Sequence, residues 1–377
     1  MVKRIDSYTR IQNIGIIGAG LMGVEIAAAN VRSGFPVWIC DANPAVLETF
    51  PQRLAEELAL DGDPEAVAQM LAMVTPCPLE ELAQCNLLIE AIVENFDVKA
   101  ALYQDFKPFF RPGMIFATNT STIPIERLAT VFPFPKNFAG LHFLHPVWNR
   151  ELVEVIPSSQ VCEMVTQRLC DYVLSLEKTP LCVGDCPGFV VNRLLQPYLN
   201  ESMLLLQDGI PMENIEHAAQ KFGWEWGPLR LMDEIGIDVI FHSGKVLYEA
   251  YPDRVIPSPI LITMMKKKYF GRKCGKGFYD WGENWRETLH DRTAEPCGFA
   301  STAQDVVDQW KNDVPTRMSL PDIAGRLTTA MALEAARIVV DDVVSEQGQV
   351  DMAAVIGLGF PESRRGPLAW FAKEAVK

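Results

Sequence analysis

The chain has 377 residues, which is more than one ordinary hydrophobic core organises, so we expect two or more domains. Hydrophobic residues make up 49% and charged residues 22% of the chain, as is typical of a globular protein in water. The net charge of −14 argues against nucleic acid as a partner, because binding to a phosphate backbone needs a basic surface.

No segment predicts export or membrane insertion. The N terminus has no apolar signal core, and no uninterrupted apolar run approaches the ~20 residues that cross a bilayer. The nine cysteines show no paired CxxC spacing, and in a chain of this length they are typical of reduced thiols. We therefore expect a cytoplasmic protein with no membrane partner and no metal site.

A strand-like run at 13–17 leads directly into a helical stretch through the motif Gly18-Ala19-Gly20-Leu21-Met22-Gly23. In such a motif Gly18 allows a tight turn, Gly20 lets the backbone approach a pyrophosphate, and Gly23 lets helix and strand pack closely. The helix N terminus offers N–H groups and a positive dipole end to phosphates. The motif and its context predict a dinucleotide site that includes Leu21 and Met22.

A second strand-like run, at 36–40, ends in Asp41, eighteen residues after Gly23. An acid at this place can accept hydrogen bonds from both ribose hydroxyls and repels a 2′-phosphate, which favours NAD over NADP. The alternative is a Gly-rich turn with an incidental aspartate.

Polar residues follow two further buried strand-like runs, at 86–92 and 114–118. In a doubly wound sheet the ligand lies at the carboxyl ends of the strands. The residues at or just past those ends are Glu94, Lys99, Asn119 and Ser121. Each alone is equally well explained by turn chemistry, but their shared placement favours contact with the ligand.

The runs 140–144 and 152–156 place His142 and Glu154 twelve positions apart, with a turn between them. Adjacent strands joined by a turn bring two such side chains within hydrogen-bond reach. An imidazole held by a carboxylate is a good general base near neutral pH. We therefore predict a catalytic pair; the alternative is a core histidine beside a surface glutamate.

Pro and Gly residues at 184–188 mark a domain boundary, after which the pattern becomes helical. The helical part contains a repeat, 187–281 and 320–377, in which Arg193 and Glu201 correspond to Arg326 and Glu334. We expect the second copy to be structural packing for the first. The expected divisions are a nucleotide-binding domain (1–186), a helical domain (187–285), a connector (286–319) and a second helical repeat (320–377).

Between the two copies, the segment 266–276 has six basic residues in eleven, including Lys273. In an acidic protein such a cluster suits a phosphate-bearing ligand. The alternative is a solvated run of charges.

Taken in order over about residues 13–281, these motifs resemble those of the L-3-hydroxyacyl-CoA dehydrogenase family. The pieces that carry the resemblance are 16–23, Glu90-Ala91-Ile92-Val93-Glu94-Asn95, Asn119-Thr120-Ser121, Gly140-Leu141-His142-Phe143, 152–156, 187–193 and Gly275-Lys276-Gly277-Phe278-Tyr279. The duplicated helical tail is similar to the dehydrogenase part of the multifunctional fatty-acid oxidation enzymes. Because no stretch resembles the enoyl-CoA hydratase domain of those enzymes, we expect a dehydrogenase without it.

The resemblance implies an α/β Rossmann-type doubly wound sheet followed by an all-α region. The implied reaction is NAD-dependent oxidation of an L-3-hydroxyacyl-CoA thioester to the 3-oxoacyl-CoA, as in fatty-acid β-oxidation. His142 matches the catalytic base and Glu154 its partner, while Ser121 and Asn192 match contacts to the reacting end of the substrate. The residues that match contacts to NAD are Asp41, Glu94, Lys99 and Lys273.

The chain departs from the family pattern in two places. His145 replaces an asparagine that lies close to nicotinamide and substrate in the family. The region 44–73 is acidic and has no lysine, where the family often meets the 3′-phosphoadenosine of CoA with serine and lysine. Two alternatives therefore stay open: an NAD-binding protein with a decayed substrate site, and a dehydrogenase of a non-CoA 3-hydroxy acid.

The family generally forms homodimers through its helical domain. A second helical repeat in the same chain could fill that interface, which would leave a monomer.

Overall fold

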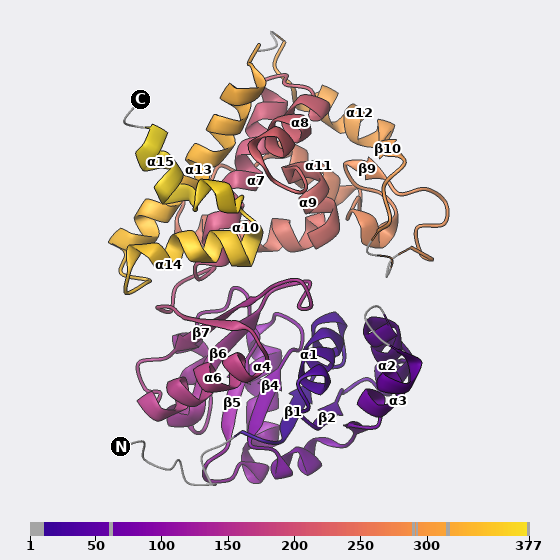
Figure 1. Cartoon of the computed structure of the whole chain (residues 1–377), viewed down its shortest axis with the longest axis vertical. Coiled ribbons are helices and arrows are strands. Elements are labelled where there is room, and N and C mark those ends of the chain that lie inside the picture. The colour runs from indigo at the N-terminus through magenta and orange to yellow at the C-terminus, as the bar shows by residue number, and fades with distance from the viewer. Residues whose placement is uncertain (1–10, 60–62, 289–290, 292, 314–316, 375–377) are drawn as a thin grey trace. The chain divides into compact units, whose positions relative to one another are not determined.

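The structure is a computed structural model that describes residues 11–59, 63–288, 291, 293–313 and 317–374. It divides into two compact units, residues 1–186 and 187–377 (Figure 1). Residues 1–10, where the sequence analysis expects no signal core, lie outside the described residues. In the described part of the chain, no helix combines the length and apolarity needed to cross a membrane.

The first unit is built on an eight-stranded sheet with the order β3-β2-β1-β4-β5-β6-β7-β8. Its strands are β1 (Ile14–Ile17), β2 (Val37–Cys40), β3 (Val74–Pro76), β4 (Leu87–Glu90), β5 (Ile115–Thr118), β6 (Phe138–Phe143), β7 (Leu152–Pro157) and β8 (Thr179–Cys182). Neighbouring strands are parallel except β6 and β7, which pair antiparallel. The first six strands thus follow the doubly wound order of dinucleotide-binding sheets.

Helices cover both faces of this sheet, which explains why β1, β4 and β5 are buried along their whole length. The helices of the unit are α1 (Leu21–Arg32), α2 (Pro44–Ala59), α3 (Pro64–Leu71), η1 (Leu79–Gln84), α4 (Phe96–Phe106), η2 (Lys107–Phe109), α5 (Ile125–Ala129), η3 (Pro135–Asn137) and α6 (Glu163–Ser175). On one face α1 and α6 lie side by side, joined by a 2.8 Å hydrogen bond from the Tyr172 hydroxyl to Asn30 Oδ1. On the other face Tyr103 of α4 packs edge-on against Phe116 and Phe138.

Strand alternation decides which face of β6 and β7 carries chemistry. Leu141 and Val155 point into the core that also contains Leu169 of α6. The intervening His142 and Glu154 therefore point to the opposite face, the one covered by α4. They stand directly opposite each other in the antiparallel register of β6 and β7.

The second unit is helical. Its elements are α7 (Val191–Gln207), α8 (Met212–Phe222), α9 (Pro228–Ile235), α10 (Ile237–Ala250), α11 (Pro259–Lys266), η4 (Arg272–Cys274), β9 (Tyr279–Asp280), β10 (Gly298–Phe299), α12 (Ser301–Trp310), α13 (Leu320–Val340), α14 (Gln347–Met352), η5 (Ala353–Gly357), η6 (Glu362–Arg364) and α15 (Pro367–Glu374). The segment expected as a connector contains α12. Its buried Ala303, Val306 and Val307 lie on a helix that contacts α11 and α7.

The two helical copies meet through α7 and α13, and their equivalent residues exchange ion pairs. Arg193 of α7 binds Glu334 at 2.6 Å, and Arg326 of α13 in turn binds Glu201. Each arginine also binds a second carboxylate of the other copy: Arg193 binds Asp341 and Arg326 binds Asp208, each at 2.7 Å. Contacts of this reciprocal kind are those of a two-fold symmetric interface, here formed inside one chain.

A second pair of equivalent contacts, one in each helical copy, supports the same internal symmetry. Glu216 accepts a hydrogen bond from the backbone N–H of Leu229 at 2.7 Å, in the first turn of α9. Asp351 accepts one from the backbone N–H of Leu368 at 2.8 Å, in the first turn of α15. Each copy therefore uses a carboxylate of its preceding helical segment to hold the start of its next helix.

Candidate active site

The His142 imidazole lies between a carboxylate and a hydroxyl. Its Nδ1 is 2.7 Å from Glu154 Oε2, and its Nε2 is 3.0 Å from Ser121 Oγ. His142 and Glu154 are buried, and Ser121 is partly buried after β5. The contact expected from the spacing of His142 and Glu154 is thus present, and Ser121 meets the same ring.

The loop after β5 is tied to the end of β6 by Asn119. Its Oδ1 accepts a 2.8 Å hydrogen bond from the backbone N–H of Phe143, the residue that follows His142. This bond fixes where the Ser121 hydroxyl stands relative to the imidazole. In this structure Asn119 therefore has a positioning role, beside the cofactor contact expected for it.

Glu94 organises the rest of that loop. Its Oε1 accepts four hydrogen bonds, from the Thr120 hydroxyl at 2.6 Å, the Ser121 N–H at 3.0 Å, and the N–H and hydroxyl of Thr122 at 2.9 Å each. Its other oxygen lies 3.6 Å from the Lys99 ammonium. Burial by itself would raise the pKa of Glu94, but Lys99 and the threonine hydroxyls outweigh it and hold the pKa below its usual value.

Lys99 is 1% exposed, and its ammonium binds Glu90 Oε1 at 2.6 Å. Glu90 is the last residue of β4 and is fully buried; its Oε2 accepts from the Thr118 hydroxyl at 2.8 Å. Glu90 is not among the site residues predicted from the sequence. The feature that could have indicated it is a carboxylate inside an otherwise apolar strand, nine residues before a lysine.

The glycine loop between β1 and α1 has the geometry of a phosphate cradle. Gly18 has a φ of +105°, and a Cβ on Gly23 would lie 1.9 Å from the Gly18 carbonyl oxygen. Next to Gly20, by contrast, a Cβ would meet nothing within 4 Å. Open space in front of the first turn of α1 fits a pyrophosphate.

Asp41, at the end of β2, is joined to this loop. Its Oδ2 accepts a 2.8 Å hydrogen bond from the Ala19 N–H, and Oδ1 accepts one from the Asn43 N–H. The carbonyl oxygen of the same Ala19 accepts a 2.7 Å hydrogen bond from Arg53 of α2. Asp41 remains partly exposed, as a ribose contact requires.

A second histidine–carboxylate contact lies close by in the chain. His145 Nδ1 is 2.9 Å from Glu25 Oε1, and Glu25 Oε2 accepts a hydrogen bond from the Val147 N–H at 2.9 Å. Glu25 is 5% exposed on α1, only two residues after the glycine motif. The sequence points to His145 but not to Glu25. The one feature that could have indicated Glu25 is its place as an acidic residue in a largely apolar helix.

Two predicted site residues belong to the second unit. Asn192 lies in the first turn of α7, and a Cβ on Gly188 would meet its Cβ at 3.5 Å. Lys273 lies in η4, where its ammonium is 2.5 Å from Asp238 Oδ1. The following Gly277–Tyr279 segment is anchored by buried Asp233, which accepts from the N–H groups of Phe278 and Tyr279 at 2.9 Å each.

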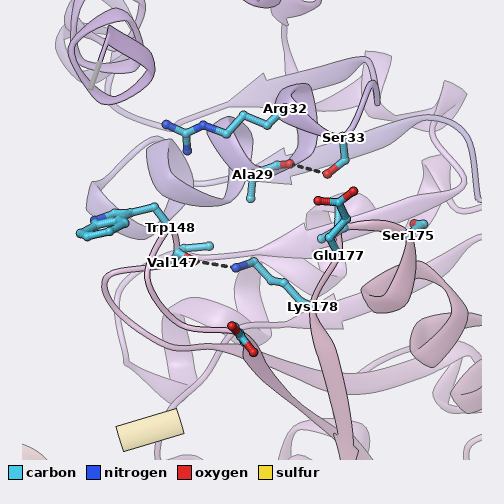
Figure 2. A pocket seen from close by; sticks show the side chains of 10 residues that line it. Ala29, Arg32, Ser33, Val147, Trp148, Ser175, Glu177 and Lys178 are labelled. Carbon is cyan, nitrogen blue, oxygen red and sulfur yellow. Dashed lines mark hydrogen bonds between the residues drawn. The ribbon is translucent and has the colours of Figure 1, made fainter. Parts of the chain in front are cut away.

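Figure 2 shows a pocket of about 620 Å³ in the first unit. Its lining residues are Ala29, Arg32, Ser33, Val147, Trp148, Glu151, Ser175, Leu176, Glu177 and Lys178. None of them is a predicted site residue. Lys178 donates to the carbonyl oxygens of Val147 and Arg150 at 2.6 and 2.8 Å, and so holds the loop that follows His145.

The sheet order, the glycine loop and the histidine–glutamate pair together define a Rossmann-type dinucleotide-binding protein. Comparison with known proteins narrows this class. The family model "3-hydroxyacyl-CoA dehydrogenase, NAD binding domain" matches residues 13–186, and the model of the C-terminal domain of the same family matches residues 188–281. The chain therefore belongs to the 3-hydroxyacyl-CoA dehydrogenase family of NAD-dependent oxidoreductases, and its cofactor is NAD.

Individual relatives agree with this family. The chain is 33% identical over 374 residues to the fatty acid oxidation complex subunit alpha of Acinetobacter baylyi, a match that covers 97% of this chain and 51% of the relative. The chain thus spans about half the length of the curated relatives it matches.

Solved structures of similar proteins agree as well. The 3-hydroxybutyryl-CoA dehydrogenase of Escherichia coli is 25% identical with a TM-score of 0.80, and the match covers 97% of this chain and 92% of that one. The (S)-3-hydroxybutyryl-CoA dehydrogenase of Ralstonia eutropha is 32% identical with a TM-score of 0.67, over 72% of this chain and 100% of that one.

Proposed function

We propose that this protein oxidises L-3-hydroxyacyl-CoA thioesters to 3-oxoacyl-CoA, with His142 as the general base. The observation that carries the proposal is the imidazole held on Nδ1 by buried Glu154 while Nε2 faces the Ser121 hydroxyl. A carboxylate on Nδ1 favours the tautomer that carries its proton there, which makes Nε2 the proton acceptor.

In this proposal Nε2 takes the proton of the substrate hydroxyl, and Glu154 stabilises the resulting imidazolium. The Ser121 hydroxyl, already within 3.0 Å of Nε2, would donate to the oxygen on which the carbonyl develops. Asn192 is assigned to the thioester end of the substrate. Bound NAD would supply the hydride acceptor that side chains lack.

The same proposal assigns the cofactor contacts. The glycine loop with Leu21 and Met22 would receive the pyrophosphate, and Asp41 the adenosine ribose. Glu94 and Asn119 would face the nicotinamide half. Lys99 would act there by fixing Glu94, because its ammonium is buried between two carboxylates. Lys273 would meet a phosphate group of the ligand.

A second candidate function is a dehydrogenase of a non-CoA 3-hydroxy acid. It is favoured by the acidic region 44–73, which has no lysine to meet the phosphates of CoA. The third candidate is an NAD-binding protein without turnover; it is motivated by His145, whose Nδ1 lies 2.9 Å from Glu25 Oε1.

The test follows NADH consumption with acetoacetyl-CoA in the wild type and in His142→Ala. Because general-base catalysis contributes ~10²–10⁴-fold, we expect kcat to fall by about that factor while NADH affinity is unchanged. His217→Ala, an exposed histidine on α8, is the matched control and should keep wild-type kcat.

The alternatives have their own outcomes in this assay. Turnover of free acetoacetate but not of its thioester would establish the second candidate function. Binding of NADH with no turnover of either compound would establish the third. Equal kcat in His142→Ala and wild type would remove His142 from the mechanism.

We also infer that the enzyme is a monomer. The reciprocal ion pairs of α7 and α13 support this inference, because the second helical copy occupies the face of the first that a second chain would need.

A further inference from the structure

Two thiols of the first unit are in direct contact. Cys170 lies on α6 and Cys182 is the last residue of β8, the edge strand of the sheet. Their Sγ atoms are 3.3 Å apart, and both thiols are reduced. Since a disulfide bond is about 2.05 Å long, the two sulfurs need to approach by little more than ~1 Å to form one.

The two sulfurs differ in character. Cys182 is exposed, and the hydrogen bond from Cys170 lowers the pKa of its thiol to about 7, against the opposing effect of partial burial. The same hydrogen bond and burial raise the pKa of Cys170. Cys182 is thus the thiolate that reacts first, and Cys170 the neighbouring thiol that follows.

Another cysteine cluster shows what an unreactive arrangement looks like. Cys40, Cys77 and Cys85 are buried, and burial raises the pKa of their thiols to about 12, 11 and 12. Those thiols stay protonated and are shielded from solvent. The exposure of Cys182 and the direct sulfur–sulfur contact of 3.3 Å set the pair Cys170–Cys182 apart from them.

We propose that Cys170 and Cys182 form a redox-sensitive modification site, which hydroperoxides convert into a disulfide. The Cys182 thiolate attacks one oxygen of hydrogen peroxide, the O–O bond breaks, and hydroxide leaves, which gives a sulfenic acid. The Cys170 sulfur then attacks the Cys182 sulfur, the S–O bond breaks, and water leaves with the Cys170 proton. The two thiols lose two electrons in total, and the peroxide is reduced to water.

The position of the site predicts what the bond does to the fold. Cys182 pairs with Val155 in the parallel register of β7 and β8, and Val155 lies in the core under α6. A bond from Cys182 to α6 therefore forms on the face of the sheet opposite Glu154. The disulfide ties the edge strand to its covering helix and leaves the histidine–glutamate pair in place.

The test treats the whole protein with a small excess of hydrogen peroxide, blocks the remaining thiols by alkylation, and maps peptides by mass spectrometry. We expect one intramolecular cross-link that joins the peptides of Cys170 and Cys182 and disappears with dithiothreitol. We also expect iodoacetamide at pH 7 to alkylate Cys182 of the untreated protein several-fold faster than the exposed Cys297.

Variants sharpen the test. In Cys170→Ser the sulfenic acid has no partner, so Cys182 should proceed to the sulfinic acid. Cys162→Ser, an exposed thiol just before the same helix, should form the cross-link as the wild type does. Oxidation of wild-type Cys182 without a bond to Cys170, or alkylation no faster than that of Cys297, would overturn the proposal. These readouts need no enzyme activity, so they are independent of the proposed function.

Discussion

Lys99 carries a charge into the interior of the first unit, where Glu90 and Glu94 hold it. Replacing it by methionine would leave the fully buried Glu90 without a counter-charge. Because breaking one side of a buried ion pair costs ~3–5 kcal/mol, we expect Lys99→Met to lower the free energy of unfolding by about that amount. Urea unfolding followed by circular dichroism measures the difference.

The exposed Lys107, the residue directly after α4, supplies the control, since Lys107→Met should change stability by less than ~0.5 kcal/mol. A double variant, Lys99→Met with Glu90→Gln, should recover a large part of the loss because it removes the stranded charge. Full stability in Lys99→Met alone would contradict the prediction and show that the contact with Glu90 does not hold the fold.

At the scale of residues, the sequence indicates which side chains belong to the site better than it indicates which side chains they contact. The sequence predicts the contact of His142 with Glu154 because a turn joins their strands, which makes the contact nearly local. Glu90 and Glu25 were not foreseen as partners. Each lies inside an apolar run, and the cation or imidazole it meets is set by how separate elements pack.

At the scale of elements, two alanine substitutions in the glycine loop should have opposite effects: one lowers stability and the other lowers the affinity for NADH. In Gly23→Ala the new Cβ meets the Gly18 carbonyl at 1.9 Å, so we expect a loss of ~1–3 kcal/mol in unfolding free energy. In Gly20→Ala the Cβ points into open space, so stability should change by less than about 1 kcal/mol. The same methyl group stands where the pyrophosphate approaches, and the Kd for NADH should rise by about tenfold, equivalent to ~1.4 kcal/mol.

Thermal unfolding without ligand and fluorescence titration with NADH separate the two effects. Gly348 of α14 has open space around it and no positive φ, so Gly348→Ala is a control for a methyl group away from the glycine loop. Unchanged NADH affinity in Gly20→Ala would show that the pyrophosphate does not pass over this residue.

The sequence predicts six of the eight strands of the first unit, because each of the six is a short apolar run bounded by turn residues; β3 and β8, at the two edges of the sheet, are not predicted. The turn between the runs that contain His142 and Glu154 also predicts the antiparallel pairing of β6 and β7, because parallel neighbours need a longer crossover connection. The segment 286–319 reads as a polar connector because α12 buries only a narrow stripe, of which Val306 and Val307 are part. Such a stripe is visible only against the helices that cover it.

At the scale of the whole molecule, the reciprocal ion pairs predict the assembly state. Sedimentation velocity at micromolar concentration should give one species with the mass of a single chain, 42.1 kDa. We expect this because, in the part of the chain that the structure describes, α7 and α13 already bury their contact surface against each other. A species of twice that mass, dissociating on dilution, would contradict the inference.

A variant shows whether the ion pairs themselves hold the two copies together. Arg193→Glu would place like charges against Glu334 and Asp341 and should destabilise the second unit, while adding Glu334→Arg should restore part of the loss. If both variants keep wild-type stability, apolar packing alone joins the copies.

The exchange between α7 and α13 also bears on how this chain can change over generations. In a dimer of identical subunits, every substitution changes both sides of the interface at once. In this chain the two sides, α7 and α13, are encoded separately and can change one at a time. A covalent tether also keeps the partner at a fixed, high effective concentration however dilute the cell content becomes. The two copies differ at one candidate site position, because Gly325 of the second copy corresponds to Asn192 of the first. The second copy can therefore change in sequence at every position that does not pack against the first copy.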